Sequence, residues 1–257
     1  MSAPPSTEAV PSAPPLSRRA ELRQATVEEI KRLARHQLAE QGPGALSLRA
    51  IARQMRMASS ALYRYFASQD DLISALCVDA YESLADAVTA ARDTRPVDDH
   101  AGQWWAICHA YRRWALDHPA DFALIFGTPV PGYQAPDHVT GPAAGRSIAV
   151  AFTVYADAVR AGAADPGRTQ VPDTSAAGDF LQKLLGEATP GYPPRLVVIA
   201  LNAYASLLGY LVAEIFGSLP RLVDETDQAY SAHVRTVMLG MGYDPALVNA
   251  VDSRPVG

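Results

Sequence analysis

The sequence of 257 residues predicts an all-α protein. Apolar residues recur at spacings of three and four in one segment after another, which indicates amphipathic helices. No segment shows the strict alternation of a half-buried strand, and the sequence contains no internal repeat. Near the N-terminus, residues 46–66 carry two short apolar stripes separated by a break. These observations predict an N-terminal three-helix domain with a helix-turn-helix, joined by a long helix to a larger helical domain.

The first elements of the chain are a tail and one helix. Residues 1–16 are rich in Pro, Ser and Ala and are predicted to form a flexible tail. The helix is predicted over residues 21–41, and Gly42-Pro43-Gly44 ends it. Its apolar side consists of Leu22, Ala25, Ile30, Leu33, Ala34 and Leu38.

Residues 46–66 are predicted to form two short helices with a tight turn at Arg56-Met57. Ser47 and Ser59 are the predicted N-cap residues of these helices. Helices this short are unstable alone, because nucleation costs more than one turn of hydrogen bonds returns, so they must pack on a third helix. The apolar residues that would pack are Leu48, Ile51, Ala52 and Met55 in the first helix and Leu62, Tyr65 and Phe66 in the second.

The outward side of the two short helices is polar and basic, which is typical of a helix-turn-helix whose second helix enters the major groove of DNA. Residues expected to contact bases are Ser59, Ser60, Ala61, Tyr63 and Arg64. Phosphate contacts that set the register are expected from Ser47, Arg49, Tyr63 and Tyr65. Arg18 and Arg19 follow the tail, as an arm that could reach the minor groove or the DNA backbone.

Three short motifs in this region resemble the N-terminal domain of tetracycline-repressor (TetR) type regulators. They are Ser47-Leu48-Arg49-x-Ile51-Ala52, Ala61-Leu62-Tyr63-x-Tyr65-Phe66 and Ser68-x-Asp70-Asp71-Leu72. The chain has Arg56 where the family usually has a turn glycine, and Ala58 where it usually has Ser or Thr. It also has Gln69-Asp70 where a lysine-bearing turn is common, so no phosphate contact by that lysine is expected here. The resemblance implies a DNA-binding regulator.

The charge of the chain is divided between its two ends. Residues 17–65 contain ten Arg and Lys against four Glu, a net charge of +6, although the whole chain carries −5. From residue 66 onward the net charge is −10. A basic end on an acidic body suits a protein that contacts phosphates at one end only, and the acidic body would favour one orientation on DNA. A solvated helix face could carry the same charges.

The remainder of the chain is predicted to be helical. Ser68, with Asp71 three residues later, resembles a capping box that opens a long helix to about Arg92. Further helices are predicted at 104–115, 120–126, 143–163, 179–187, 195–216 and 224–239, with a loop at 128–142 and a break at 164–174. The predicted domains are the helix-turn-helix domain at 17–67 and the regulatory and dimerisation domain at 68–245, followed by a C-terminal tail at 246–257.

Residues 195–216 are apolar enough to suggest a membrane span, yet burial against other helices explains them equally well. The segment is interpreted as a dimer-forming helix, because Asn202, Ser206, Gly209 and Ala213 line one small, polar side. The resemblance implies a four-helix bundle made by the last two long helices of each subunit.

The resemblance also extends to the subgroup whose regulatory domain carries a Trp-His-Gly signature. The comparable stretch, 201–209, lacks the Trp and the His. This part of the resemblance therefore depends on Tyr111-Arg-Arg-Trp-Ala115 and His118-Pro-Ala-Asp-Phe122.

A ligand pocket in the larger domain is expected to be apolar and aromatic. The candidate lining residues are Trp104, Cys108, His109, Tyr111, Phe122, Phe126, Phe152, Tyr155 and Asn202. Each of them could also be an ordinary core residue.

The sequence offers no enzymatic motif. None of the histidines forms a helical ligand pair at four-residue spacing or a zinc pattern with cysteine, and no phosphate loop, nucleophile elbow or dinucleotide fingerprint is present. Metal, cofactor and catalysis are therefore not expected. Cys77 and Cys108 are expected to be reduced, buried thiols. No secretion signal is seen, so a cytoplasmic protein is expected.

The predicted function is that of a homodimeric transcriptional repressor that a small apolar or aromatic ligand releases from a palindromic DNA operator. The alternative is a DNA-binding regulator without an effector, whose larger domain serves only dimerisation or partner docking. An enclosed apolar cavity in that domain would favour the first.

Overall fold

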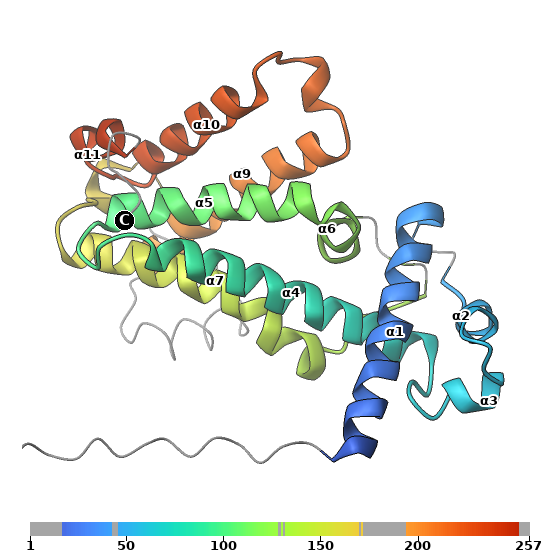
Figure 1. Ribbon diagram of the computed structural model, residues 1–257. Helices are drawn as coiled ribbons and strands as arrows, with labels where there is room; N and C mark the ends of the chain where they lie inside the picture. Colours follow the sequence, from blue (N-terminus) through green and yellow to red (C-terminus); the bar gives the residue numbers. More distant parts are fainter. Residues whose placement is uncertain are drawn as a thin grey trace, which may run out of the picture.

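The computed structural model describes residues 17–42, 46–127, 130, 132–169, 171 and 194–251 (Figure 1). Over these residues the protein is built from α-helices, and the only β contact among them is an isolated bridge between Ala164 and Tyr243. The all-α prediction is confirmed. The predicted tail at 1–16 and the predicted helix at 179–187 lie outside the described residues.

The N-terminal domain, called the head below, contains α1 (Arg18–Gln41), α2 (Leu48–Gln54) and α3 (Ser59–Leu62). The helix α1 begins three residues earlier than predicted, because the Ser17 side chain accepts a hydrogen bond from the Ala20 N–H and caps it. Arg18 and Arg19 therefore lie in the first turn of α1 and not in an arm that precedes it, and their contact with DNA stays a prediction. Gly42, at φ +79°, ends the helix.

Two of the three predicted serine caps are confirmed. Ser47 accepts a hydrogen bond from the Ala50 N–H at the start of α2, and Ser68 accepts one from the Asp71 N–H at the start of the next helix. The third is wrong, because Ala58 is the N-cap of α3, and it has no side chain that could cap the helix.

Arg56 has φ +54° in the turn between α2 and α3. The structure thus requires a left-handed backbone conformation at the position where the family usually has glycine. A non-glycine residue in this conformation lowers the free energy of unfolding by about 1 kcal/mol.

The long helix α4 (Gln69–Asp93) joins the head to the larger domain, called the body below. Its first half contributes Leu72, Ile73 and Leu76 to a hydrophobic core that contains residues of α1, α2 and α3. Its second half contributes Leu84 and Val88 to the core of the body. Figure 1 shows α4 running from the head along α5 and α7. A displacement of α4 would therefore move residues in the cores of both domains.

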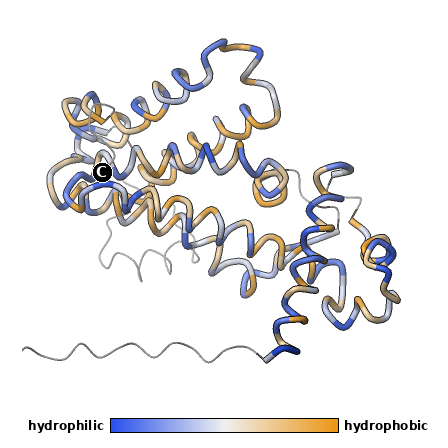
Figure 2. Tube along the Cα trace, viewed as in Figure 1, coloured by the Kyte–Doolittle hydropathy of each residue, from blue (hydrophilic) through white to orange (hydrophobic). Residues whose placement is uncertain are grey.

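The body surrounds a core rich in aromatic residues. Besides α4 it contains α5 (His100–Asp117), α6 (Pro119–Phe126), α7 (Asp137–Arg160), α9 (Pro194–Ile215), α10 (Thr226–Gly240) and α11 (Pro245–Ala250), with 3-10 turns at Pro166–Arg168 and Leu219–Arg221. Figure 2 shows hydrophobic and hydrophilic residues alternating along these helices, as expected where each helix buries one side.

Two predicted boundaries of the body are wrong. The helix α7 begins at Asp137 and includes Pro142, whereas the sequence pattern placed residues 128–142 in a loop. Pro142 is the sixth residue of α7 and lies inside the helix, and the backbone hydrogen bond that it removes is lost at an exposed position. The expected C-terminal tail instead starts with α11, which buries Val248, and Val251 directly after it is buried too.

Candidate functional site

The outward surface of the head carries the side chains predicted to contact DNA. Ser59, Ser60, Arg49 and Arg64 are exposed, and Tyr63 is 45% exposed although it follows a helix whose Leu62 is fully buried. One shallow hollow on this surface is lined by Ser47, Leu48, Arg49, Tyr63, Ala67, Ser68 and Gln69. The structure therefore brings three of the four predicted phosphate contacts, Ser47, Arg49 and Tyr63, around one depression.

Two residues of the predicted DNA surface are less accessible than expected. Tyr65 is half-buried, and the guanidinium of Arg23 lies 5.0 Å from the centre of its ring. Arg23 also donates a hydrogen bond to the Arg64 carbonyl at 3.4 Å. Ala61 is half-buried as well. This arrangement suits Tyr65 for holding the end of α3 against α1.

Ion pairs connect the head to the body. Asp79 of α4 accepts hydrogen bonds from Lys31 and Arg35 of α1, each at 2.8 Å. Arg35 also reaches Asp121 of α6 at 3.3 Å. These three pairs, called the clamp below, fix α1 relative to α4 and α6. The orientation of the DNA-facing surface therefore depends on the positions of two body helices.

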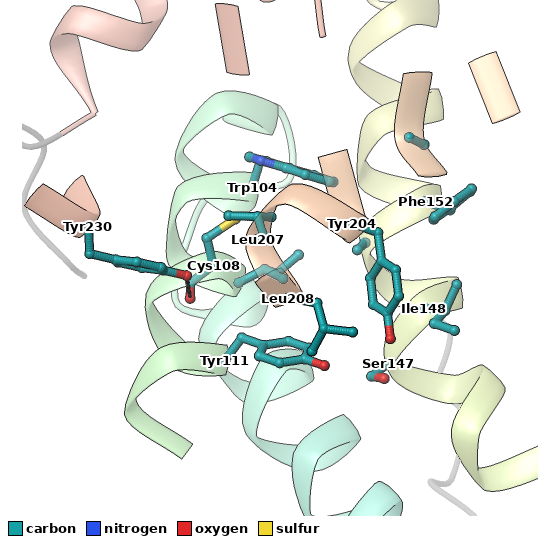
Figure 3. Close-up of a pocket in the computed structure, with 13 residues that line it drawn as sticks. Trp104, Cys108, Tyr111, Ser147, Ile148, Phe152, Tyr204, Leu207, Leu208 and Tyr230 are labelled. Atoms are coloured by element: carbon teal, nitrogen blue, oxygen red, sulfur yellow. Dashed lines mark hydrogen bonds between the residues drawn. The ribbon is translucent and has the colours of Figure 1, made fainter. Parts of the chain in front are cut away.

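The body contains a small apolar cavity of about 40 Å³ between α5, α7, α9 and α10, called the pocket below (Figure 3). A volume of this size holds only a few water molecules. It is lined by Trp104, Ile107, Cys108, Tyr111, Ser147, Ile148, Ala151, Phe152, Ala200, Tyr204, Leu207, Leu208 and Tyr230.

Four of the nine predicted ligand residues line the pocket, namely Trp104, Cys108, Tyr111 and Phe152. The other five lie elsewhere. Phe122 and Tyr155 are fully buried core residues, and the Tyr155 hydroxyl donates a hydrogen bond to the Met241 carbonyl at 2.8 Å. Phe126 packs between Tyr81 and Tyr111.

His109 and Asn202 are also outside the pocket. Asn202 is exposed on α9. His109 packs against the ring of Trp105 and edge-on against Tyr230. Burial, helped by Arg112 and other nearby arginines, lowers the pKa of His109 to about 4. His109 is therefore an uncharged packing residue at neutral pH.

Apart from Phe152, the α7 and α9 walls of the pocket were missed by the sequence analysis. Ala200, Tyr204, Leu207 and Leu208 follow the helical spacing of one stripe, which was a usable signal. It was not used because the whole segment is apolar, so its pocket-facing side could not be distinguished from its other sides. On α7, Ile148, Ala151 and Phe152 recur at the same helical spacing, and of these only Phe152 was predicted.

The other side of α9 is largely exposed within the described residues, although Ser206 lies 3.4 Å from the His233 ring of α10. Asn202, Ser206 and Gly209 are exposed and Ala213 is half-buried, and a Cβ at Gly209 would meet no atom within 4 Å. Residues 195–215 are long and apolar enough to cross a membrane, yet only 33% of the most apolar window is buried within the monomer. In water, an apolar helix with this much of its surface exposed is expected to pack against another protein surface.

No group of three or more His, Cys, Asp or Glu that could hold a metal ion is found among the described residues. Both cysteines are buried, and burial raises the pKa of the Cys77 thiol to about 11 and that of Cys108 further still. Neither is suited to act as a thiolate nucleophile.

A basic helix-turn-helix surface fixed to a helical body defines a DNA-binding regulator, and comparison with known proteins agrees. Residues 30–76 match the family of bacterial regulatory proteins of the tetR type, and residues 104–237 match the tetracyclin repressor-like C-terminal domain. The HTH-type transcriptional regulators Rv1816 of Mycobacterium tuberculosis and Mb1846 of Mycobacterium bovis are each 39% identical over 208 residues, covering 79% of this chain and 86% of the relative. The chain therefore belongs to the TetR family of transcriptional regulators, which are not enzymes.

Solved structures support the same fold. The crystal structure of a regulatory protein named SCO4313 matches with a TM-score of 0.67 and 33% identity, covering 86% of this chain and 99% of that one. A protein of unknown function from Rhodococcus sp. RHA1 matches with a TM-score of 0.62 and 22% identity, covering 84% and 95%. The latter likeness concerns the fold alone.

Proposed function

We propose that this TetR-family regulator is a homodimeric, cytoplasmic repressor, and that a small apolar or aromatic ligand releases it from a palindromic operator. Two heads held in one dimer would place their recognition helices in successive major grooves, about 34 Å apart. The exposed Arg49, Tyr63 and Arg64 support DNA contact, and the uncovered side of α9 supports dimerisation.

The observation that carries the effector proposal is a chain of contacts from the pocket to the head. Tyr111, which lines the pocket, lies against Phe126 of α6 with 6.0 Å between ring centres. Phe126 in turn packs edge-on against Tyr81 of α4 at 6.1 Å. Asp121 of α6 belongs to the clamp on α1.

A ligand that moves Tyr111 therefore acts on α4 and α6, the two helices that hold the head. The change in operator affinity is limited by the difference between the ligand's affinities for two conformations, one in which the heads fit the operator and one in which they do not.

The experiment measures ligand binding and operator release on the same protein. All three tryptophans lie on α5, so tryptophan fluorescence reports the body while a labelled operator duplex reports the head. A Phe126→Ala variant should still bind the ligand, because Phe126 does not line the pocket, but should release the operator less readily. Val97→Ala, at an exposed apolar residue of the body, is the control and should behave as the parent protein.

The alternative is a regulator without an effector, whose body serves dimerisation or partner docking only. The small size of the pocket, about 40 Å³, favours it. A broad screen of apolar compounds in which none changes tryptophan fluorescence, melting temperature or operator affinity would support this alternative. A compound that stabilises the body without changing operator affinity would contradict the proposed mechanism.

A further inference from the structure

Three of the hydroxyl groups that line the pocket are gathered at one end of it. Away from this end, the Tyr230 hydroxyl donates a hydrogen bond to the Cys108 carbonyl, and the buried indole N–H of Trp104 has no partner among the described residues. Figure 3 shows the hydroxyl groups of Tyr111 on α5 and Tyr204 on α9 pointing toward Ser147 on α7. Trp104 lies at the opposite end, and the surface between is formed by aliphatic and aromatic side chains. Three hydroxyl-bearing residues from three helices thus converge on one place in an otherwise apolar cavity.

The Tyr111 hydroxyl is buried and makes no hydrogen bond of ordinary length to a described residue, although the Tyr204 hydroxyl lies near enough to interact with it. Buried polar groups without a partner are rare in folded proteins, and one that faces a cavity often has a ligand or water as its partner. Burial, with a contribution from the nearby Tyr204 hydroxyl, raises the pKa of Tyr111 well above its ordinary value. Burial raises the pKa of Tyr204 too. Both groups therefore keep their protons at neutral pH and can donate hydrogen bonds.

The pocket offers nothing to balance a charged ligand. None of its described lining residues is ionised at neutral pH. The nearby Arg112 donates two hydrogen bonds to Glu214, at 2.8 and 2.6 Å, and lies 2.8 Å from Asp227. Because its charge is already paired, it is not available to a ligand. Moving an ion from water into such surroundings is strongly unfavourable.

We propose that the effector is an uncharged, mostly apolar molecule with one oxygen acceptor, such as a carbonyl, which receives hydrogen bonds from Tyr111 and Tyr204. This assignment rests on the proposed function, because it names the chemical class of ligand for the same pocket. The ring or chain of the ligand lies against the apolar side chains toward Trp104. Binding enlarges the cavity of about 40 Å³ by displacing side chains, among them Tyr111, which starts the contact chain to the head.

The test uses three probes of nearly the same shape: acetophenone, α-methylstyrene and benzoate. The second replaces the carbonyl oxygen of the first by a CH₂ group, and the third replaces its methyl group by a charged oxygen. Dissociation constants are measured by isothermal titration calorimetry on the full-length protein without DNA. The variants are Tyr111→Phe and Tyr204→Phe, which keep the ring and remove the hydroxyl. Tyr210→Phe is the matched control, since Tyr210 lies on α9 and does not line the pocket.

We expect Tyr111→Phe and Tyr204→Phe each to weaken acetophenone binding about fivefold, the value of one net hydrogen bond. They should leave α-methylstyrene within about twofold, and Tyr210→Phe should change neither probe. Benzoate should bind at least about a hundredfold more weakly than acetophenone.

Three results would overturn the inference. These are an equal loss of affinity for acetophenone and α-methylstyrene in the tyrosine variants, benzoate binding as tight as that of acetophenone, and no binding of any probe to the parent protein. These titrations contain no DNA, so they are separate from the test of the proposed function. Selective binding without operator release would contradict the proposed function alone.

Discussion

Arg49 lies exposed on α2, at the rim of the hollow that it shares with Ser47 and Tyr63. Because this position suits a phosphate contact, Arg49→Ala should weaken binding to operator and random duplexes alike. The slope of log affinity against log salt should fall by about 0.9. Fluorescence anisotropy at several salt concentrations measures both. Arg92→Ala, at the far end of α4, is the control. An altered sequence preference with an unchanged salt slope would contradict the assignment.

Arg56 adopts a left-handed conformation at φ +54°. Arg56→Gly removes the strain at this position but increases the freedom of the unfolded chain, and each effect is worth about 1 kcal/mol at most. We therefore expect the free energy of unfolding to change by less than about 1 kcal/mol. Chemical denaturation measures this. A large destabilisation would show that the Arg56 side chain makes a contact that the fold requires.

His109 makes the stability of the body sensitive to acid. Its pKa is lowered to about 4, mainly by burial, so the unfolded chain binds a proton more readily than the folded one. The free energy of unfolding should be constant with respect to this group above about pH 6.5 and should decrease as the pH falls from there to about 4. His233, whose pKa burial also lowers, acts in the same direction.

Denaturation curves at several pH values test the role of His109. His109→Gln should show a smaller loss of stability between pH 6.5 and about 4 than the parent protein. His138→Gln, at an exposed position, should not. An identical pH dependence in the parent and in His109→Gln would refute the prediction.

Among single residues, most of those with a local backbone role were predictable, with the exception of the N-cap of α3, which is Ala58 and not Ser59. Ser47 and Ser68 cap helices and Arg56 occupies the left-handed turn, because these roles depend on near neighbours in the sequence. Membership of the pocket depends on which side of one helix meets another. Phe122 was therefore predicted to line the pocket but is core, whereas Tyr204 lines it and was missed.

At the scale of elements, the clamp determines how firmly α1 is held. Asp79→Asn leaves Lys31 and Arg35 without their shared carboxylate. We expect a loss of about 1 kcal/mol in the free energy of unfolding, together with weaker operator binding. Asp86→Asn, which breaks a pair with Arg146 inside the body, is the control and should leave operator affinity unchanged. Unchanged stability and operator affinity in Asp79→Asn would contradict a role for the clamp.

The order and type of the helices in the described part of the chain could be predicted from apolar periodicity and caps. The boundaries that failed have specific causes. Residues 128–142 contain four prolines and were predicted to form a loop, although α7 begins at Asp137 and includes Pro142. The six-residue α11 is too short for a periodic signal, and it is stabilised by the burial of Val248 in the body core.

At the scale of the whole molecule, the uncovered side of α9 predicts a dimer. A Cβ at Gly209 meets no atom of the described residues within 4 Å, so Gly209→Leu should leave the monomer fold intact and obstruct a partner. Ala213→Glu should weaken the dimer by burying an unpaired charge. Ala90→Leu, at an exposed alanine of α4, is the control. Light scattering that found the parent protein to be a stable monomer at micromolar concentration would refute the dimer.

The division of charge between the head and the body favours one orientation of the protein on DNA. The head carries +6 and the rest of the chain from residue 66 carries −10, so the body is repelled from the duplex that the head contacts. With two heads on one dimer, the operator should be an imperfect palindrome whose half-sites lie about one helical turn, 10 base pairs, apart.

A selection of genomic duplexes by the purified protein at low salt, followed by sequencing, tests the central claim most directly. The account predicts enrichment of an imperfect palindrome with half-sites about 10 base pairs apart or a multiple of this. Substitutions within Ser59, Ser60 and Ala61 should change the enriched sequence, because these residues lie on the surface expected to face the bases. Recovery of duplexes without any shared sequence, or of none at all, would contradict the account.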